Sequence, residues 1–115
     1  VSNRAADSIF VSIHYNRAPR SGARGVEVYY FSPRSWRLAS NILRQATRAY
    51  PAGNRGIKRN NFYVLRENRR PAVLCELAFL SNMLDNRYAQ SSLYRQQLAE
   101  LVAAGIVAER QSAER

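Results

Sequence analysis

The chain has 115 residues, of which 46% are hydrophobic, so it has room for one domain with a core of limited size and none for a second. Its 18 basic residues outnumber 8 acidic ones and give a net charge of +10, and Lys58 is the only lysine. A surface so rich in guanidinium groups suits an anionic partner: nucleic acid, anionic lipid headgroups, or an anionic polymer such as a bacterial cell wall.

Cysteine content and hydropathy exclude further classes. Cys75 is the only cysteine, so neither an intrachain disulfide nor a thiolate metal cluster can form, and we expect it to pack as a small apolar residue. The sequence contains no run of about 18 apolar residues, the length that spans a bilayer. Residues 1–4 have no hydrophobic signal core, so we expect any export signal to lie outside this sequence.

Two strands are predicted near the start of the chain. Residues 3–7 resemble a helix end, and residues 8–13 form a β-branched and apolar run that predicts a buried strand, with His14 at its end. After a loop rich in turn residues, residues 25–31 predict a second strand, whose apolar run is interrupted by Glu27.

A helix is predicted after the second strand. We expect Ser32 to cap it, Pro33 to occupy its first position, and residues 51–53 to end it. Its apolar face is predicted from residues at helical spacing, namely Trp36, Ala39, Ile42, Leu43, Ala46 and Tyr50.

The second half of the chain predicts a basic loop at residues 54–61, a short strand at residues 62–65, and a buried strand at residues 72–76 that ends on Glu76. Residues 88–109 predict one long helix, with a frayed tail after it. Its inward stripe is predicted to be Leu93, Tyr94, Leu98, Leu101, Val102 and Ile106. This alternation of elements predicts an α/β fold, a mixed, mostly parallel sheet flanked by helices.

Two residues are the first candidates for chemistry. Glu76 is a lone carboxylate in an apolar run, which is costly unless it has a partner or a function; pairing with an arginine is one explanation. His14, the only histidine, follows a strand, where ligands and catalytic groups of α/β sheets gather. Metal-assisted hydrolysis needs imidazole or carboxylate ligands and a separate carboxylate that takes a proton from water.

Glu27 leaves another interpretation open. Glu27 and Glu76 could flank a glycosidic bond as a pair of carboxylates, or Glu27 could simply bind an arginine. The sequence contains no glycine-rich phosphate loop, no serine nucleophile elbow and no second histidine for a triad.

Four blocks of sequence occur in order along the chain. They are SIHYN at residues 12–16, RGVEVYYF at 24–31, RGIK at 55–58 with FYVLR at 62–66, and PAVLCELAFLSN at 71–82. Together they resemble the zinc-dependent N-acetylmuramoyl-L-alanine amidases of the Amidase_3 family, over about residues 3–108.

This resemblance implies hydrolysis of the amide that joins the lactyl group of N-acetylmuramic acid to the L-alanine of the stem peptide. His14 matches the family's last zinc-binding histidine and Glu76 its catalytic glutamate. Zn²⁺ would activate a water, and Glu76 would accept the water proton and pass it to the leaving amine. Asn16, in the segment after His14, and Arg55 would line the substrate groove and bind the substrate.

The chain departs from the family pattern in two ways. Ala78 stands where the family commonly has glycine. The family's first zinc-binding histidine and its zinc-binding glutamate precede the portion represented here, so we expect residues 1–115 to be a single amidase-like catalytic domain that lacks its N-terminal portion.

Three functions follow from these observations. The first is a monomeric amidase of the cell envelope, periplasmic or extracellular, whose partner is peptidoglycan and which has no membrane span. The alternative is a non-catalytic module that binds peptidoglycan through a basic groove. A nucleic-acid binder rests on charge alone, and because the arginines are scattered over several elements we expect no nucleic acid partner.

Overall fold

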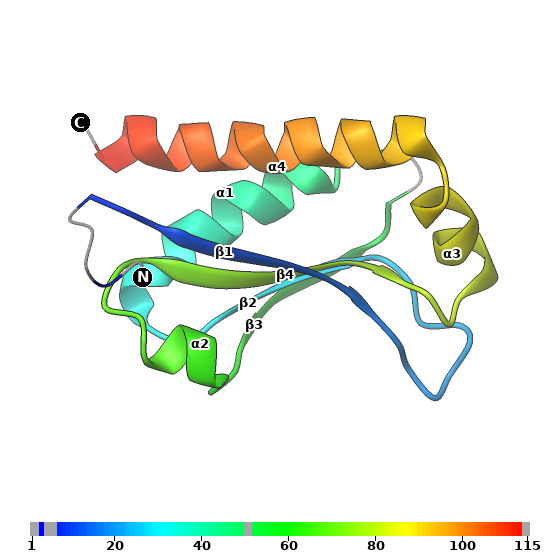
Figure 1. The fold of residues 1–115 in the computed structure, drawn as a ribbon, viewed down its shortest axis with the longest axis horizontal. Helices are drawn as coiled ribbons and strands as arrows, with labels where there is room; N and C mark the ends of the chain where they lie inside the picture. The colour runs from blue at the N-terminus through cyan, green and yellow to red at the C-terminus, as the bar shows by residue number, and fades with distance from the viewer. Residues whose placement is uncertain (1–2, 4–6, 50–51, 114–115) are drawn as a thin grey trace.

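The computed structural model of the chain describes residues 3, 7–49 and 52–113. Its elements, in chain order, are β1 (Phe10–Asn16), β2 (Val26–Tyr30), the 3-10 helix η2 (Pro33–Ser35), α1 (Trp36–Ala46), β3 (Asn54–Arg59), α2 (Tyr63–Arg66), β4 (Ala72–Phe79), α3 (Met83–Ala89) and α4 (Ser92–Ala113) (Figure 1). The described strands form a sheet in the order β1-β4-β2-β3. β1 and β4 are parallel, as are β2 and β3, whereas β2 and β4 are antiparallel. The predicted α/β fold with a mixed, mostly parallel sheet is confirmed.

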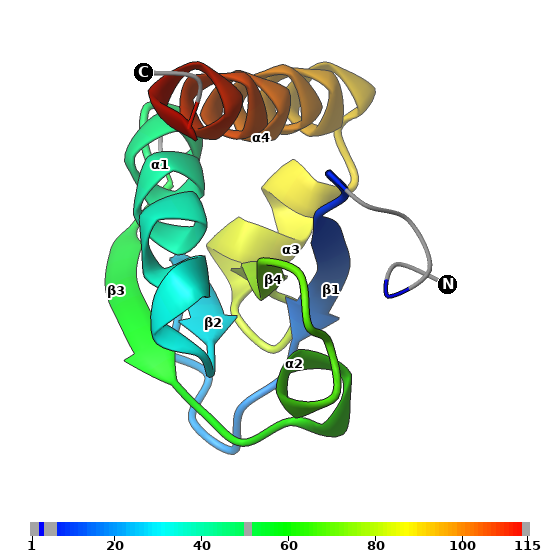
Figure 2. The ribbon, with the colours of Figure 1, turned by 90° about the vertical axis from the view of Figure 1, so that its left-hand side faces the viewer.

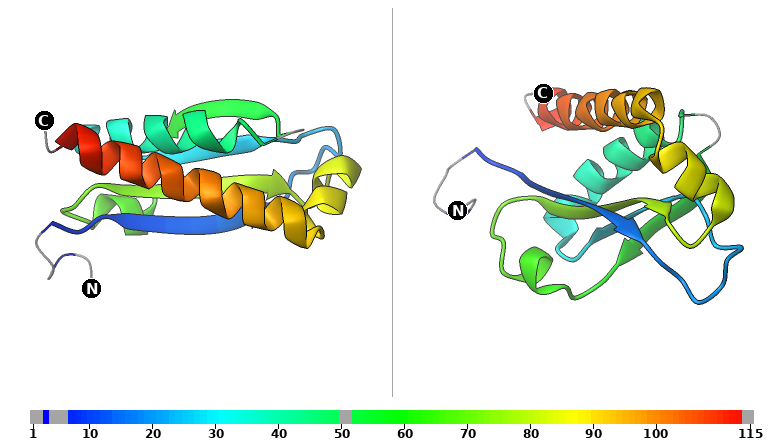
Figure 3. Two further views of the ribbon diagram at one scale, coloured as in Figure 1. Left: turned by 90° about the horizontal axis from the view of Figure 1, so that it is seen from above. Right: turned by 45° about the vertical axis from the view of Figure 1, so that its right-hand side comes forward.

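Helices α1 and α4 pack together on one side of the sheet, and the short helix α2 lies on the other side (Figure 2). Seen from above, α4 crosses the strands obliquely (Figure 3). The core on the side of α1 and α4 includes Val26, Val28, Leu38, Ile42, Leu43, Val73, Cys75, Leu77, Tyr94, Leu98 and Val102. Burial raises the pKa of the Cys75 thiol to about 12, so this residue packs as a protonated, apolar side chain.

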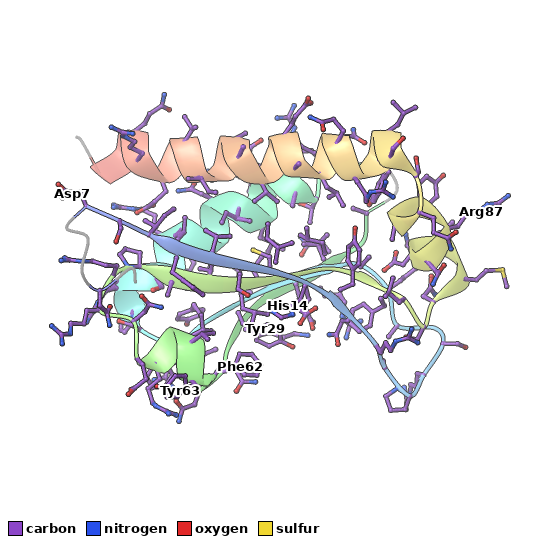
Figure 4. The ribbon with its side chains drawn as sticks, in the orientation of Figure 1. Asp7, His14, Tyr29, Phe62, Tyr63 and Arg87 are labelled. Carbon is purple, nitrogen blue, oxygen red and sulfur yellow. The ribbon has the colours of Figure 1, made fainter. Side chains whose placement is uncertain are left out.

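The opposite face of the sheet is only partly covered. Side chains alternate between the two faces along a strand, and because Val26 and Val28 are in the core under α1, Glu27 and Tyr29 point to the side of α2. Helix α2 closes a small second cluster there, made of Leu65, Ala72 and Leu74 with Phe10, Tyr29, Phe31 and Phe62. Figure 4 shows His14, Tyr29 and Phe62 on this side of the sheet. Polar residues therefore occupy the part of this face that α2 leaves open.

Two predictions for residues 54–65 are wrong. The basic segment predicted as a loop is the edge strand β3, because its backbone pairs with β2 while its charged side chains stay partly exposed. The segment predicted as a strand is the helix α2, in which the amides of Leu65 and Arg66 donate to the Phe62 carbonyl. Aromatic and β-branched composition favours a strand, but here a single helical turn buries Leu65 against the sheet.

The long helix predicted at residues 88–109 is two helices, α3 and α4. Helix α3 ends at Ala89 and α4 begins at Ser92. The Ser91 hydroxyl caps α4 by accepting a hydrogen bond from the Tyr94 amide at 3.3 Å. Of the predicted inward stripe, Tyr94, Leu98 and Val102 are buried, and Leu101 and Ile106 are partly buried. Leu93 is 84% exposed, because it lies one position away from the buried residues, which recur every four.

Several predicted boundaries shift. β1 extends to Asn16 and β4 to Phe79, so the two chemical candidates lie within strands rather than at their ends. Ser32 makes no side-chain capping hydrogen bond, and a 3-10 turn precedes α1. Trp36 is exposed rather than part of the core. The predicted frayed tail at residues 111–115 is wrong for residues 111–113, which continue α4. Residues 114–115, Tyr50, and residues 4–6 of the predicted helix end at 3–7 lie outside the described residues.

The part of the chain that the structure describes contains no helix that is both long enough and apolar enough to cross a membrane.

Gly105 of α4 allows the backbones of α1 and α4 to pack closely together. A methyl group at Gly105 would lie 2.6 Å from the Ile42 Cα and 2.8 Å from the Asn41 carbonyl oxygen. These are backbone atoms, so no side-chain rotation relieves the contact. The two helices can therefore approach this closely only with glycine at this position.

We expect Gly105→Ala to lower the free energy of unfolding by about 1–3 kcal/mol, as overpacking does, although alanine is otherwise favoured in a helix. Urea denaturation measures the change. Gly22→Ala is the matched control, because no atom lies within 4 Å of the added methyl group; it should change stability by about 1 kcal/mol or less. Equal effects of the two substitutions would contradict the close helix contact.

Candidate functional site

Three ionisable side chains lie in one row across the open face of the sheet. His14 of β1 is the register partner of Glu76 on β4, and Glu76 is in turn the partner of Glu27 on β2. Directly opposite residues of neighbouring strands point to the same face, with Cβ atoms about 5 Å apart. Strand pairing alone therefore brings His14 and Glu76 together and adds Glu27 to them.

One oxygen of the Glu76 carboxylate lacks a hydrogen-bond partner among the described residues. Its Oε2 atom is buried and accepts no hydrogen bond within the part of the chain that the structure describes. Burial raises the pKa of Glu76; the neighbouring His14 opposes this effect, and the negative charge of Glu27 adds to it. The pairing with an arginine considered from the sequence is thus not found for Glu76 among the described residues, and burial favours its protonated form more than in an exposed glutamate.

Glu27 has the opposite environment, although it is only 2% exposed. Its Oε1 accepts hydrogen bonds from Asn16 Nδ2 at 3.2 Å and from the Tyr29 hydroxyl at 2.8 Å. Its Oε2 accepts from Arg55 Nε at 3.1 Å and from Lys58 Nζ. Four donors match the roughly four lone-pair positions of a carboxylate. Glu27 therefore does bind an arginine, as one interpretation of the sequence held.

The charge of Glu27 follows from these contacts. Burial by itself would raise the pKa of Glu27, but the hydrogen bonds from Lys58, Tyr29 and Arg55 outweigh it and lower that pKa. Burial and the hydrogen bond to Glu27 raise the pKa of Tyr29 to about 12, so its hydroxyl remains a donor. The Tyr29 ring packs edge-on against Phe62, with ring centroids 5.2 Å apart, which ties the site to the cluster under α2.

The four site residues predicted from the sequence lie in this neighbourhood. Asn16 and Arg55 both contact Glu27, and Arg55 also stacks over the Phe79 ring, with its Cζ 4.7 Å from the centroid. Lys58 and Tyr29 were not singled out from the sequence. Lys58 is the only lysine in the chain, and this could have marked it as a candidate site residue. Its contact with Glu27, however, depends on the register of β3 with β2, which the sequence does not show.

Asp85 holds the strand ends near the site. It is buried, and its Oδ2 accepts hydrogen bonds from the amides of Gly25, before β2, at 2.8 Å and of Phe79, at the end of β4, at 2.9 Å. Its other oxygen lies 3.6 Å from Arg24 Nε. One carboxylate at the start of α3 thus fixes β2 and β4 relative to each other.

The donors present fit a metal site only in part. The imidazole of His14 is exposed, and its Nε2 lies 2.9 Å from Ser12 Oγ. In the described ranges no three His, Cys, Asp or Glu side chains lie close enough together to hold a metal ion. A catalytic zinc site takes three protein ligands. His14 could supply one of them, and at least one other would have to come from outside the described residues.

Comparison with known proteins places this site in context. The model of the Amidase_3 family, described as N-acetylmuramoyl-L-alanine amidase, matches residues 1–108. An uncharacterized cell wall amidase of Bacillus anthracis is 38% identical over 109 residues, covering 86% of this chain and 20% of that protein. A probable cell wall amidase, LytH, of Staphylococcus epidermidis is 34% identical over 97 residues, covering 84% of this chain and 33% of its own length.

A solved structure supports the same relationship. The N-acetylmuramoyl-L-alanine amidase from Clostridium difficile 630 is 31% identical and superposes with a TM-score of 0.91 over 96% of this chain and 62% of its own. The chain therefore spans a fifth to a third of these two curated relatives and less than two thirds of the solved amidase.

We expect Glu76→Gln to stabilise the fold at pH 7. The pKa of Glu76 is raised in the folded state, so its contribution to stability is present below the ordinary glutamate pKa of about 4.3 and is lost as pH rises through the folded-state pKa. Glutamine avoids this loss, and the gain should disappear below about pH 4, where Glu76 is protonated in both states.

Urea denaturation at pH 3.5 and pH 7 measures the difference, with Glu100→Gln on the exposed side of α4 as the control. Destabilisation by Glu76→Gln at pH 7, or the same change at both pH values, would contradict the unpartnered state of this carboxylate.

Proposed function

The chain belongs to the Amidase_3 family of N-acetylmuramoyl-L-alanine amidases, and on this premise we propose that it is the catalytic part of a peptidoglycan hydrolase that cleaves the amide between N-acetylmuramic acid and the L-alanine of the stem peptide. The related proteins named as cell wall amidases support peptidoglycan as the substrate. Because peptidoglycan lies outside the cytoplasmic membrane, we propose that the protein acts in the cell envelope, in the periplasm or outside the cell.

The contrast between two neighbouring carboxylates carries this proposal. Hydrolysis of an amide needs a base that takes a proton from water and returns it to the leaving amine, and a carboxylate performs this best when its pKa is raised toward the working pH. Glu76 has a buried, unpartnered oxygen and a raised pKa. Glu27 has all its oxygens engaged and a lowered pKa, which argues against a glycosidase pair.

In the proposed reaction the residues of the site divide proton transfer, substrate binding and metal binding among them. Glu76 accepts the proton of the attacking water and delivers it to the departing L-alanine nitrogen. Asn16 and Arg55 bind and orient the substrate. Both donate hydrogen bonds to Glu27, which lies opposite Glu76 on the neighbouring strand. Zinc, the cofactor we propose, would polarise the scissile carbonyl and lower the pKa of the water when bound. His14 would supply one ligand to it.

We further propose that the remaining ligands lie in a part of the domain outside residues 1–115. The chain spans 62% of the solved amidase from Clostridium difficile, and β1 is an edge strand within the described sheet. An apolar groove of about 320 Å³ runs between β1 and α4, lined among others by Ile13, Leu98 and Ala103. Ile13 is 58% exposed. Burial of this apolar surface favours the groove as the place where that part packs.

A second candidate function is a non-catalytic module that binds peptidoglycan through its basic surface. The absence of a three-residue metal cluster among the described residues favours it. Metal analysis of the chain and sedimentation with insoluble cell wall separate the two functions: binding without metal and without release of stem peptides supports the module, and release of stem peptides excludes it.

The role of Glu76 is tested in a lengthened chain, extended upstream with its natural sequence to the length of the solved amidases. Glu76→Gln should lower the release of stem peptides from peptidoglycan by about 10²–10⁴-fold, the size of a general-base contribution, and leave the zinc content unchanged. Glu100→Gln should release stem peptides as the parent does. Full activity of the Glu76 variant would disprove the assignment.

The groove is tested by filling it. In the lengthened chain, Ala103→Trp should reduce both the zinc content, measured by mass spectrometry, and the release of stem peptides, because a bulky side chain in the groove prevents the packing that completes the site. Ala104→Trp is the matched control, since Ala104 is exposed beside the groove without lining it. If both variants bind zinc like the parent, the groove is not where the rest of the domain packs.

A further inference from the structure

The buried carboxylate of Glu27 holds two cations whose other donors have no hydrogen-bond acceptor among the described residues. Arg55 Nε and Lys58 Nζ both donate to Glu27 Oε2. Among the described residues, Glu27 is the hydrogen-bond acceptor of both cations, although a guanidinium has five donors and an ammonium three. The Arg55 and Lys58 side chains are 34% and 40% exposed, while that of Glu27 is 2% exposed. In this cluster the negatively charged side chain is therefore buried, and the two positively charged side chains are partly exposed to solvent.

We infer that Glu27 is a positioning residue, which fixes Arg55 and Lys58 as a binding site for the carboxylates of the substrate's stem peptide. This inference rests on the proposed function and adds Glu27 and Lys58 to it. The two cations and one anion carry a net charge of +1, so the cluster still attracts an anion. A guanidinium held at Nε and stacked on the Phe79 ring keeps its terminal nitrogens in a defined plane, as bidentate recognition of a carboxylate requires.

The position of the cluster agrees with that ligand. Arg55 and Lys58 lie on β3 and Glu76 lies on β4, with β2 between them. The Arg55 and Lys58 side chains both reach Glu27 on β2, the register partner of Glu76, so their charged groups lie one strand spacing, about 5 Å, from β4, a distance that one or two extended peptide residues cover. A stem peptide whose scissile amide lies at Glu76 can therefore bring the carboxylates of its first residues to the cluster.

A purely electrostatic role makes the opposite prediction for one variant. Glu27→Gln removes a negative charge, so charge alone would make the carboxylates of the peptide bind more tightly. If Glu27 acts by positioning, the same substitution releases Arg55 and Lys58 from their shared anchor and weakens that binding. The sign of the change distinguishes the two roles.

The experiment measures binding rather than hydrolysis, so its result is independent of the proposed reaction. The protein is the lengthened chain carrying Glu76→Gln, which keeps the ligand intact. The probes are N-acetylmuramoyl-Ala-Glu-Lys with free carboxylates and the same molecule with its carboxylates amidated, and their dissociation constants are measured by calorimetry. We expect the free form to bind about tenfold more tightly or better, as hydrogen bonds to charged groups imply.

Glu27→Gln and Lys58→Met should each abolish most of this preference. Glu109→Gln is the matched control, since Glu109 is also a buried carboxylate that accepts from an arginine, Arg37, and an amide, Asn41, but between α1 and α4; it should keep the preference. Should Glu27→Gln fail to fold, Glu27→Asp, which keeps the charge but shortens the side chain, tests the positioning: it should also abolish most of the preference, whereas a purely electrostatic role would leave the preference unchanged. Equal binding of the two probes by the parent, an unchanged preference in Lys58→Met, or tighter binding of the free form by Glu27→Gln would overturn the inference.

Discussion

The antiparallel pairing of β2 with β4 is the constraint on which the site depends. It places Glu27 directly opposite Glu76, two carboxylates that repel each other unless one of them is neutralised. The surrounding residues resolve this conflict by giving all the donors to one carboxylate. Glu27 receives two cations, a tyrosine hydroxyl and an amide, so it stays ionised, while Glu76 keeps a raised pKa.

The rest of the fold holds this row in place. Helices α1 and α4 bury the opposite face of the sheet, and they pack closely against each other at Gly105. Asp85 joins the ends of β2 and β4. On the face of the site, α2 covers only the cluster around Leu74 and leaves the polar row open. A site on strands supported in this way can hold its side chains in a defined geometry, which catalysis requires.

The chain belongs to the Amidase_3 family, and its described residues supply only some of the groups that the proposed reaction needs. Its described residues provide a base candidate, one imidazole and a cluster of cations. They do not provide three metal ligands. Within the described sheet β1 is an edge strand, and an apolar groove lies between it and α4; both are the basis for proposing that further residues pack there. The division of the site between this chain and further residues is therefore the central feature of the proposal.

The sequence by itself predicted the α/β class and the two central strands, because these depend on local composition and apolar runs, and the resemblance of four sequence blocks indicated the family. It also singled out His14 and Glu76 as candidates, whose roles remain a proposal. It did not reveal that residues 54–59 are a strand, that residues 63–66 are a helix, or that Ser91 divides the last helical region. Only the tertiary structure decided that Glu27 lies against Glu76 and gathers Arg55 and Lys58. The reason is physical: strand register is set by contacts between residues far apart in the chain, and a local pattern contains no information about which strands become neighbours.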